Sequence, residues 1–235
     1  MSSIGMNKLT RALNSCKRTQ RWYTSGKKGG SSKRYMDRQV RDPYVRAAAL
    51  EQYRARSSYK LIGLIDKYKL LPQASNTCVV DCGAAPGGWS QVLARRMAGK
   101  GAEPRVIAID LLAMRPLEGV QILEGDFTEA SMKQQIVEIV AGRRVGLVLS
   151  DMAPSFTGHR SVDALRTTAL CEDVVDFAEE FLSPGGNMVL KYFMGGDEHE
   201  LRQRLRHMFA QVKIDKPNAS RKQSAENYFV CLQKE

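Results

Sequence analysis

A loop of small residues follows the apolar run at Cys78–Asp81 and forms the first candidate site in the chain. Small side chains let a ligand approach the backbone just before a helix begins, as in nucleotide-binding loops. The glycines fall at 83, 87 and 88, which is not the GxGxxG spacing of dinucleotide-binding proteins. The loop alone is also typical of any tight strand-to-helix turn. Its candidate ligand-binding residues are Gly83, Ala84, Pro86, Gly87, Gly88 and Trp89.

Acidic residues follow the next two strand-like runs. Asp110 lies 22 residues beyond Gly88, where a carboxylate can accept hydrogen bonds from both ribose hydroxyls of an adenosine. Asp126 can accept from an adenine amino group, and the neighbouring Phe127 can cover the ring. Either acid alone could be a turn residue or a helix cap. Together with the small-residue loop, they predict a site for an adenosine-containing cofactor that has no pyrophosphate.

The elements that must position these residues alternate between strand and helix patterns. Strand-like runs lie at Cys78–Asp81, Arg105–Asp110, Gln121–Leu123, Val145–Ser150, Asn187–Lys191, Val212–Ile214 and Tyr228–Leu232. Helix-like stretches lie at Trp89–Ala98, Ala130–Val140, Val162–Leu182 and Glu198–Phe209, and a further helical pattern ends before Pro72. This alternation predicts an α/β fold, with a mostly parallel seven-stranded sheet covered on both faces and ligands bound at the carboxyl ends of the strands.

The composition fits one globular domain with a basic extension. The chain has 235 residues and a net charge of +11, and residues 1–56 hold 14 basic and 3 acidic side chains while residues 57–235 hold 22 of each. No apolar run approaches the roughly 20 residues of a membrane span. The five cysteines show no CxxC pair and no zinc-ligand spacing, so we expect neither a structural metal nor disulfides.

The N-terminal segment divides into two predicted parts. Residues 1–23 contain basic residues, no acid and an amphipathic helical pattern, which is typical of a mitochondrial transit peptide cleaved near Tyr23. A basic arm that only binds RNA is the alternative. Residues 24–49 form a predicted basic arm, whose mixture of Arg and Tyr suits either RNA binding or a solvated helix. Residues 50–235 form the predicted catalytic domain.

From about Tyr53 onward the chain resembles the FtsJ/RrmJ family of RNA ribose 2′-O-methyltransferases. The segments that carry the resemblance are Arg56–Leu61, Asp81–Gln91, Ser150–Pro154, Pro184–Gly186 with Lys191, and Lys216–Pro217 followed by Ser220, Arg221 and Glu226. The resemblance implies a Rossmann-like class I methyltransferase fold and S-adenosylmethionine as cofactor. The family's catalytic Lys-Asp-Lys-Glu set falls on Lys60, Asp151, Lys191 and Glu226.

The chemistry of ribose methylation agrees with these four residues. A ribose hydroxyl is a poor nucleophile and must lose its proton while it is aligned with the methyl group. Lys191 is the candidate base, and the charge of Lys60 together with partial burial would favour its neutral amine form. Asp151 and Glu226 would orient the lysines, and Asp151 could also face the methionine end of the cofactor. The alternative is a set of solvated surface charges.

Within the family, the compact size, the close match to the bacterial ribosomal enzyme and the transit-peptide pattern favour a monomeric enzyme of the mitochondrial matrix. The resemblance implies mitochondrial large-subunit rRNA, or the pre-ribosomal large subunit, as its substrate, with a uridine of the A loop as the methylated nucleotide and ribosome assembly as the process it supports. The candidate RNA contacts are Arg34, Arg54, Arg56 and Arg221. Three alternatives stay open: a ribosome-assembly factor that binds RNA without needing catalysis, a tRNA 2′-O-methyltransferase, and a nicotinamide-dependent oxidoreductase, which the glycine spacing disfavours.

Overall fold

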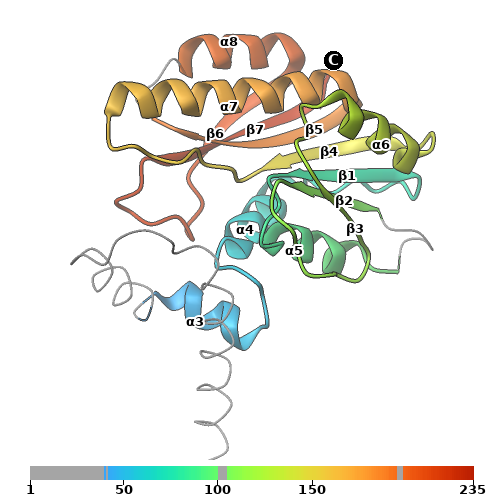
Figure 1. The fold of residues 1–235 in the computed structure, drawn as a ribbon, viewed down its shortest axis with the longest axis horizontal. Helices are drawn as coiled ribbons and strands as arrows, with labels where there is room; N and C mark the ends of the chain where they lie inside the picture. The colour runs from blue at the N-terminus through green and yellow to red at the C-terminus, as the bar shows by residue number, and fades with distance from the viewer. Residues whose placement is uncertain (1–39, 41, 100–104, 195–197) are drawn as a thin grey trace, which may run out of the picture.

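The computed structural model describes residues 40, 42–99, 105–194 and 198–235 (Figure 1). Seven strands form one sheet: β1 (Thr77–Cys82), β2 (Val106–Asp110), β3 (Val120–Glu124), β4 (Arg144–Ser150), β5 (Leu182–Phe193), β6 (Phe209–Asp215) and β7 (Glu226–Lys234). The strand order is β3-β2-β1-β4-β5-β7-β6. Every pairing is parallel except those of β7, which runs antiparallel to β5 and β6. The predicted α/β fold with a mostly parallel seven-stranded sheet is therefore confirmed.

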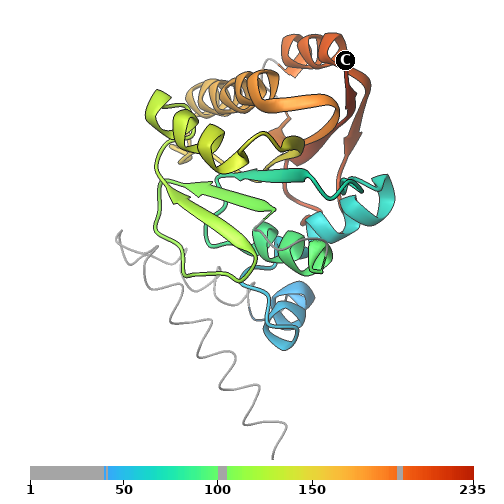
Figure 2. The same cartoon turned by 90° about the vertical axis from the view of Figure 1, so that its right-hand side faces the viewer.

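Helices cover both faces of the sheet. They are α3 (Pro43–Leu50), α4 (Ser58–Tyr68), α5 (Gly88–Met97), α6 (Ala130–Val140), α7 (Arg160–Phe181) and α8 (Glu198–Met208). The layers are clearest when Figure 2 is compared with Figure 1: α6, α7 and α8 lie on one side, and α4 and α5 lie on the other. Two separate apolar cores follow from this arrangement, one on each face.

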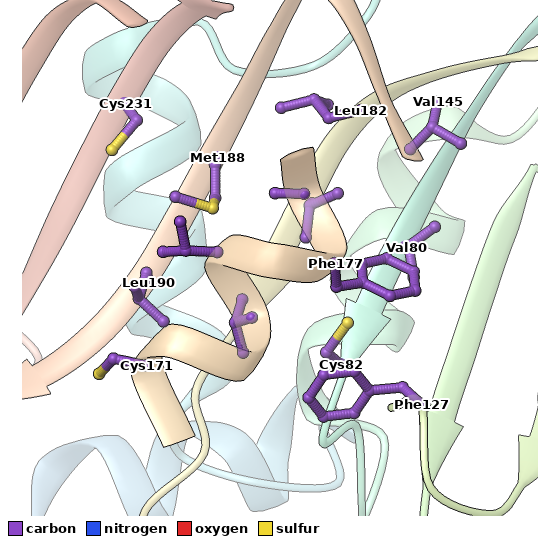
Figure 3. Packing of buried hydrophobic residues seen from close by; sticks show 14 of the residues in the cluster. Val80, Cys82, Phe127, Val145, Cys171, Phe177, Leu182, Met188, Leu190 and Cys231 are labelled. Carbon is purple, nitrogen blue, oxygen red and sulfur yellow. The ribbon is translucent and has the colours of Figure 1, made fainter. Parts of the chain in front are cut away.

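The larger core explains why the central strands have continuous apolar runs in their amino-acid sequence. Figure 3 shows Phe177 of α7 packed over Val80 and Cys82 of β1, with Phe127 beside them. All six residues of β1 are buried, because helices cover both of its faces. On the opposite face, Leu61, Leu64 and Ile65 of α4 pack in the second core, which matches the predicted helical spacing.

Some boundaries differ from the predicted ones. Strand β5 extends from Leu182 to Phe193, well beyond the predicted run at Asn187–Lys191. Helix α3 was not predicted, although its Asp-Pro start is a helix signal: Asp42 accepts a hydrogen bond from the Tyr44 backbone at 3.0 Å, and Pro43 occupies the first turn. This helix crosses the proposed boundary at residue 50. The proposed transit peptide and Arg34 lie outside the described residues.

The sheet brings chemistry-bearing residues to one edge. Strands β1, β2, β4 and β5 are parallel, so their carboxyl ends lie on the same side, toward the left in Figure 1. Strand β7 runs the other way, so its first residues, and not its last, reach this edge. The register pairs Phe193 with Glu226 and Lys191 with Tyr228, which places the start of β7 beside the end of β5.

We expect Leu64→Ala to lower the free energy of unfolding by about 2–5 kcal/mol, because Leu64 is 1% exposed and its removal leaves a cavity under the sheet. Leu50, which is 66% exposed, provides the matched control, and Leu50→Ala should stay within about 0.5 kcal/mol of the unchanged protein. Urea unfolding measures both changes, and equal effects would contradict the described core.

Candidate active site

The small-residue loop between β1 and α5 is closely packed on both sides. Gly83 and Gly87 have φ angles of +70° and +98°, which side chains of L-residues rarely adopt. A Cβ at Gly83 would overlap the Met152 side chain, and one at Gly87 would lie 2.8 Å from the Arg54 guanidinium. Gly88 is confined by Ser58, whose hydroxyl donates to the Gly88 carbonyl at 3.0 Å. Glycine is therefore required at this turn for both conformation and space.

Asp110 orients this loop in the ligand-free chain. One of its carboxylate oxygens accepts a hydrogen bond from the backbone of Ala85 at 2.8 Å, and the other accepts from the backbone of Leu112 at 2.8 Å. The Ala85–Pro86 peptide bond in the same loop is cis. The structure thus brings the predicted cofactor residues Ala84, Pro86 and Asp110 to one place, with the carboxylate held by backbone donors.

Asp126 and Phe127 have mainly local partners. Asp126 accepts from the backbone and the hydroxyl of Thr128 at 2.9 and 2.7 Å, which is the turn geometry considered as the alternative. Phe127 is 7% exposed and packs edge-on against Phe177, with ring centroids 5.8 Å apart. The ring of Phe127 thus belongs to the larger apolar core, and its role at an adenine stays a prediction.

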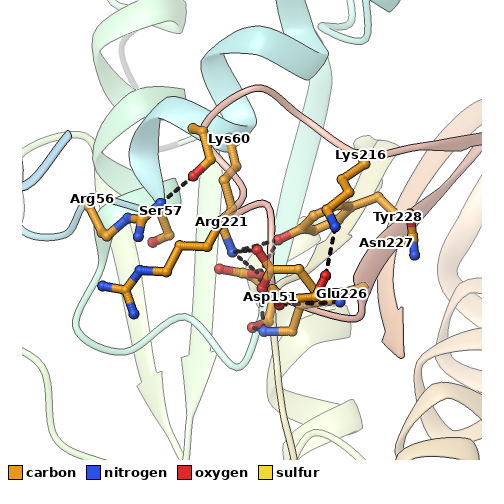
Figure 4. Close-up of polar contacts among 12 residues, drawn as sticks. Arg56, Ser57, Lys60, Asp151, Lys216, Arg221, Glu226, Asn227 and Tyr228 are labelled. Carbon is orange, nitrogen blue, oxygen red and sulfur yellow. Dashed lines mark hydrogen bonds and ion pairs between the residues drawn. The ribbon is translucent and has the colours of Figure 1, made fainter. Parts of the chain in front are cut away.

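Four charged side chains from four elements meet at the edge of the sheet (Figure 4). Lys60 of α4 lies 2.9 Å from a Glu226 carboxylate oxygen, and its Nζ is 3.8 Å from Asp151 Oδ1. Lys191 of β5 lies 3.1 Å from the same Asp151 oxygen and also donates to the Asp151 backbone carbonyl. Their side chains are 8–18% exposed. The structure brings all four predicted catalytic residues together as a buried ion network, unlike solvated surface charges.

Tyr228 is a member of this cluster that the sequence interpretation missed. Its hydroxyl donates to Asp151 Oδ1 at 2.6 Å and accepts from Lys60 Nζ at 3.0 Å. Tyr228 follows Glu226 by two residues, so both side chains lie on the same face of β7. The two-residue spacing from Glu226 is the sequence signal that could have placed Tyr228 at this site, whereas the apolar run around Tyr228 by itself indicates only a core strand.

The buried charges shift the ionisation of several neighbours. Burial raises the pKa of Tyr228, and the nearby carboxylates of Asp151 and Glu226 add to the shift. Burial alone would raise the pKa of Glu226, but the charge and hydrogen bond of Lys60, helped by Ser220 and Lys191, hold it below its usual range. Glu226 is therefore an anion and Tyr228 a neutral phenol near neutral pH.

Two of the predicted RNA-binding arginines bind a carboxylate within the chain. Arg56 contacts Asp42 at 2.5 Å, and Arg221 contacts the same Asp42 oxygen at 3.4 Å. Arg56 also donates to the Ala219 backbone carbonyl. These contacts connect α3 to the segment before α4 and to the loop before β7. The Asp42 side chain is 8% exposed, so its carboxylate lies largely out of water between the two arginines.

Arg54, another of the predicted RNA-binding arginines, also donates hydrogen bonds within the chain. Its guanidinium donates to the backbone carbonyls of Pro86, Arg115 and Pro116 at 3.2, 2.9 and 2.7 Å. Its backbone N–H donates to Gln91, whose side-chain amide in turn donates to the Gln52 carbonyl. Arg54 thus braces the small-residue loop against the preceding segment. Arg34, the remaining candidate RNA contact, lies outside the described residues.

The part of the chain that the structure describes holds no group of three His, Cys, Asp or Glu side chains arranged to bind a metal ion. No helix among the described residues has the length and apolar composition needed to cross a membrane. The candidate site consists of the small-residue loop after β1 and the ion network, which lie at the same edge of the sheet.

The family model of the FtsJ-like methyltransferase matches residues 53–234 of this chain. The chain belongs to the FtsJ-like methyltransferase family. Proteins named ribosomal RNA large subunit methyltransferase E are similar: that of Bartonella bacilliformis is 45% identical over 86% of this chain and 84% of its own length. That of Rhodopseudomonas palustris is 44% identical over 91% and 92%.

Solved structures agree with the fold of this FtsJ-like methyltransferase. A crystal structure described as that of a possible ribosomal RNA methyltransferase from Plasmodium falciparum is 29% identical, with a TM-score of 0.69 over 77% of this chain and 98% of that one. A Clostridium thermocellum protein at 18% identity and a TM-score of 0.50 shares the fold. The ion network and the loop thus lie within a domain whose family transfers methyl groups.

For this FtsJ-like methyltransferase we expect Tyr228→Phe to slow methyl transfer while the affinity for the methyl donor stays unchanged. The change removes two hydrogen bonds to charged groups, worth about 1.5–3 kcal/mol each. Tyr68→Phe is the control, since the Tyr68 hydroxyl donates to Asp215 at 2.6 Å away from the cluster. Transfer rates and calorimetric binding would be measured, and equal rates in both variants would contradict a role of the Tyr228 hydroxyl.

The buried carboxyl group of Asp81 should make the free energy of unfolding depend on pH. Asp81 is 1% exposed and accepts a hydrogen bond from the Ser90 hydroxyl at 2.6 Å. Burial raises the pKa of Asp81 to about 7, and the charge of Asp151 adds to the shift although the Ser90 hydrogen bond opposes it. The native state therefore holds a proton that the unfolded chain has already released above about pH 4. Between about pH 4 and pH 7 this group makes the free energy of unfolding fall as the pH rises.

Asp81→Asn removes this contribution to the pH dependence. We expect the free energy of unfolding of the variant, relative to the unchanged protein, to be higher at pH 8 than at pH 5. Urea unfolding at the two pH values measures the difference. A relative stability that is the same at both would show that Asp81 titrates normally.

Proposed function

We propose that this chain methylates a ribose 2′-hydroxyl of large-subunit ribosomal RNA, with S-adenosylmethionine as the methyl donor. The observation that carries the proposal is the buried network of Lys60, Asp151, Lys191 and Glu226 beside the small-residue loop. The names of the relatives at 44–45% identity support the RNA substrate. Their alignments cover more than four fifths of both chains, so the similarity extends over the whole domain.

The residues of the loop fit an adenosine-containing methyl donor. Gly83 and Gly87 give the loop backbone its left-handed turns beside the end of β1, and the Asp110 carboxylate is already oriented at the end of β2. When bound, S-adenosylmethionine supplies an electrophilic methyl group on a sulfonium. The residues that would hold it are those of the loop together with Asp110 and the Asp151 segment.

To act as a base, Lys191 must be a neutral amine, and a bound cationic ligand bears on that requirement. Lys60, Asp151 and Glu226 together carry one negative charge, so Lys191 in its neutral form leaves the network at −1. A cationic ligand beside the network restores neutrality without a proton on Lys191. Asp151 shares one oxygen among Lys60, Lys191 and Tyr228, which weakens its hold on any one donor. Lys191 Nζ then accepts the proton of the ribose hydroxyl as its oxygen takes the methyl group.

The cellular setting is part of the proposal. The basic, acid-free pattern of residues 1–23 supports import into mitochondria. The names of the relatives support action on large-subunit rRNA, and the family resemblance implies a uridine of the A loop as the target. A fusion of residues 1–30 to a fluorescent reporter tests the import. A reporter that stays in the cytosol would contradict the proposed location and leave the methyl-transfer chemistry unaffected.

We expect Lys191→Arg to reduce methyl transfer by about 10²–10⁴-fold, because arginine keeps the charge but does not act as a base near neutral pH. Binding of S-adenosylmethionine, measured by calorimetry, should be retained. Transfer of labelled methyl to large-subunit rRNA measures the rate. Wild-type transfer by a folded Lys191→Arg variant would overturn the general-base assignment.

A map of 2′-O-methylation identifies the substrate. Ribosomal RNA and tRNA from cells with and without the protein would be compared by resistance to alkaline cleavage. One large-subunit ribose that loses its protection is the expected result. Loss at a tRNA position would favour the tRNA enzyme. Unchanged methylation together with impaired large-subunit assembly would favour the noncatalytic assembly factor.

A further inference from the structure

An exposed aromatic residue lies on a fixed loop next to the catalytic lysine. Phe156 follows β4 in the loop that leads to α7, and it is 55% exposed. Its neighbours are held on both sides: Arg166 donates to the Ser155 carbonyl at 3.1 Å, and the Asp163 carboxylate accepts from the backbone of Thr157 at 2.6 Å. Asp163 also accepts from the backbone of Gly158 at 3.0 Å. The loop therefore holds a large apolar ring toward solvent in a defined position.

Phe156 packs on one residue of the active-site strand. Its ring meets that of Phe193 edge-on, with centroids 5.1 Å apart and planes at 85°. Phe193 follows Lys191 by two residues on β5, so both side chains lie on the same face, and Lys191 Nζ is 5.8 Å from the Phe193 ring centroid. Figure 1 shows that the loop after β4 and the end of β5 lie at the same edge of the sheet.

Physical chemistry restricts what can cover this ring. Phe156 packs its ring against Phe193, but more than half of the side chain keeps apolar surface in water. A ribose whose hydroxyl meets Lys191 carries its base directly on the sugar ring, and Phe193, whose ring centroid is 5.8 Å from Lys191 Nζ, is within reach of that base. Base–aromatic stacking tolerates all four bases, because each has a π-face.

We propose that Phe156 and Phe193 form a stacking subsite for the base of the methylated nucleotide, with Phe156 as the platform. The subsite deepens the proposed function and rests on it. It selects a nucleotide whose base is unpaired, since a base inside a regular helix has both faces covered by its neighbours. The recognition of an accessible nucleotide is thereby separated from the proton transfer at Lys191.

The first test compares single-turnover methyl transfer to a large-subunit rRNA fragment by three variants. Phe156→Ala should lower kcat/KM by about 5- to 150-fold, the range for loss of one base–aromatic stack, and Phe156→Trp should retain most of it. Val137→Ala, which removes an equally exposed apolar side chain from α6, should match the unchanged protein. Equal activity of Phe156→Ala and Val137→Ala would overturn the subsite.

A second arm removes the base instead of the side chain. With an abasic acceptor nucleotide in the same fragment, the kcat/KM of the unchanged protein should fall by a similar factor. Phe156→Ala should lower the kcat/KM on this abasic RNA no further. If Phe156→Ala loses the same factor on intact and abasic RNA, Phe156 does not contact the base. A docking site for a protein partner is the explanation favoured if both RNAs are methylated normally by Phe156→Ala.

A third measurement separates this inference from the proposed function. A short single-stranded RNA with 2-aminopurine, a base whose fluorescence is quenched by stacking, is titrated with the unchanged protein, Phe156→Ala and Val137→Ala. Quenching by the unchanged protein and by Val137→Ala, but not by Phe156→Ala, supports the subsite even if rRNA methylation fails. Equal quenching by all three, or none by any, overturns it even if rRNA methylation succeeds.

Discussion

The cost of burying charge governs the architecture of the active site. An ammonium or carboxylate removed from water loses several kcal/mol of hydration, and only close, well-placed counter-charges offset this loss. Lys60 and Lys191 are 8% exposed, so each needs the carboxylates of Asp151 and Glu226 within contact distance. Loss of any one member would leave a buried charge uncompensated. The network is stable only when α4, β4, β5 and β7 are all in place.

The antiparallel β7 solves a geometric problem in this arrangement. Parallel strands present only their last residues at the ligand-binding edge, and these positions supply Asp151 and Lys191. A strand of opposite direction presents its first residues there, so Glu226 and Tyr228 enter from the far end of the chain. Lys60 reaches the same point from helix α4, and Figure 4 shows its side chain directed toward Asp151 and Glu226. The site therefore draws on elements from both ends of the domain.

The pattern of the sequence was sufficient for the sheet, the main helices and the small-residue loop, because these depend on local periodicity and glycine content. The four charged residues were found through family resemblance. The rule that ligands bind after parallel strands does not reach Glu226, which begins an antiparallel one. Partners far apart in sequence escaped prediction: Asp42 and Arg221 are 179 residues apart, and no local signal indicates their contact. Asp42 therefore gives two arginines predicted to bind RNA a structural contact as well, and their role in RNA binding stays a prediction.

The contact of Asp42 with Arg56 and Arg221 also bears on the order in which the chain folds. Asp42 and Arg56 are synthesised early, whereas Arg221 and Glu226 belong to the last fifteen residues. A growing chain on the ribosome can form α4 and the parallel strands long before these residues emerge. Throughout that time Lys60 has no Glu226, and Asp42 has only one of its arginines. A chain that has not yet reached β7 thus lacks the complete network, and the described arrangement of Lys60, Asp151 and Lys191 forms only after Glu226 and Tyr228 have been synthesised.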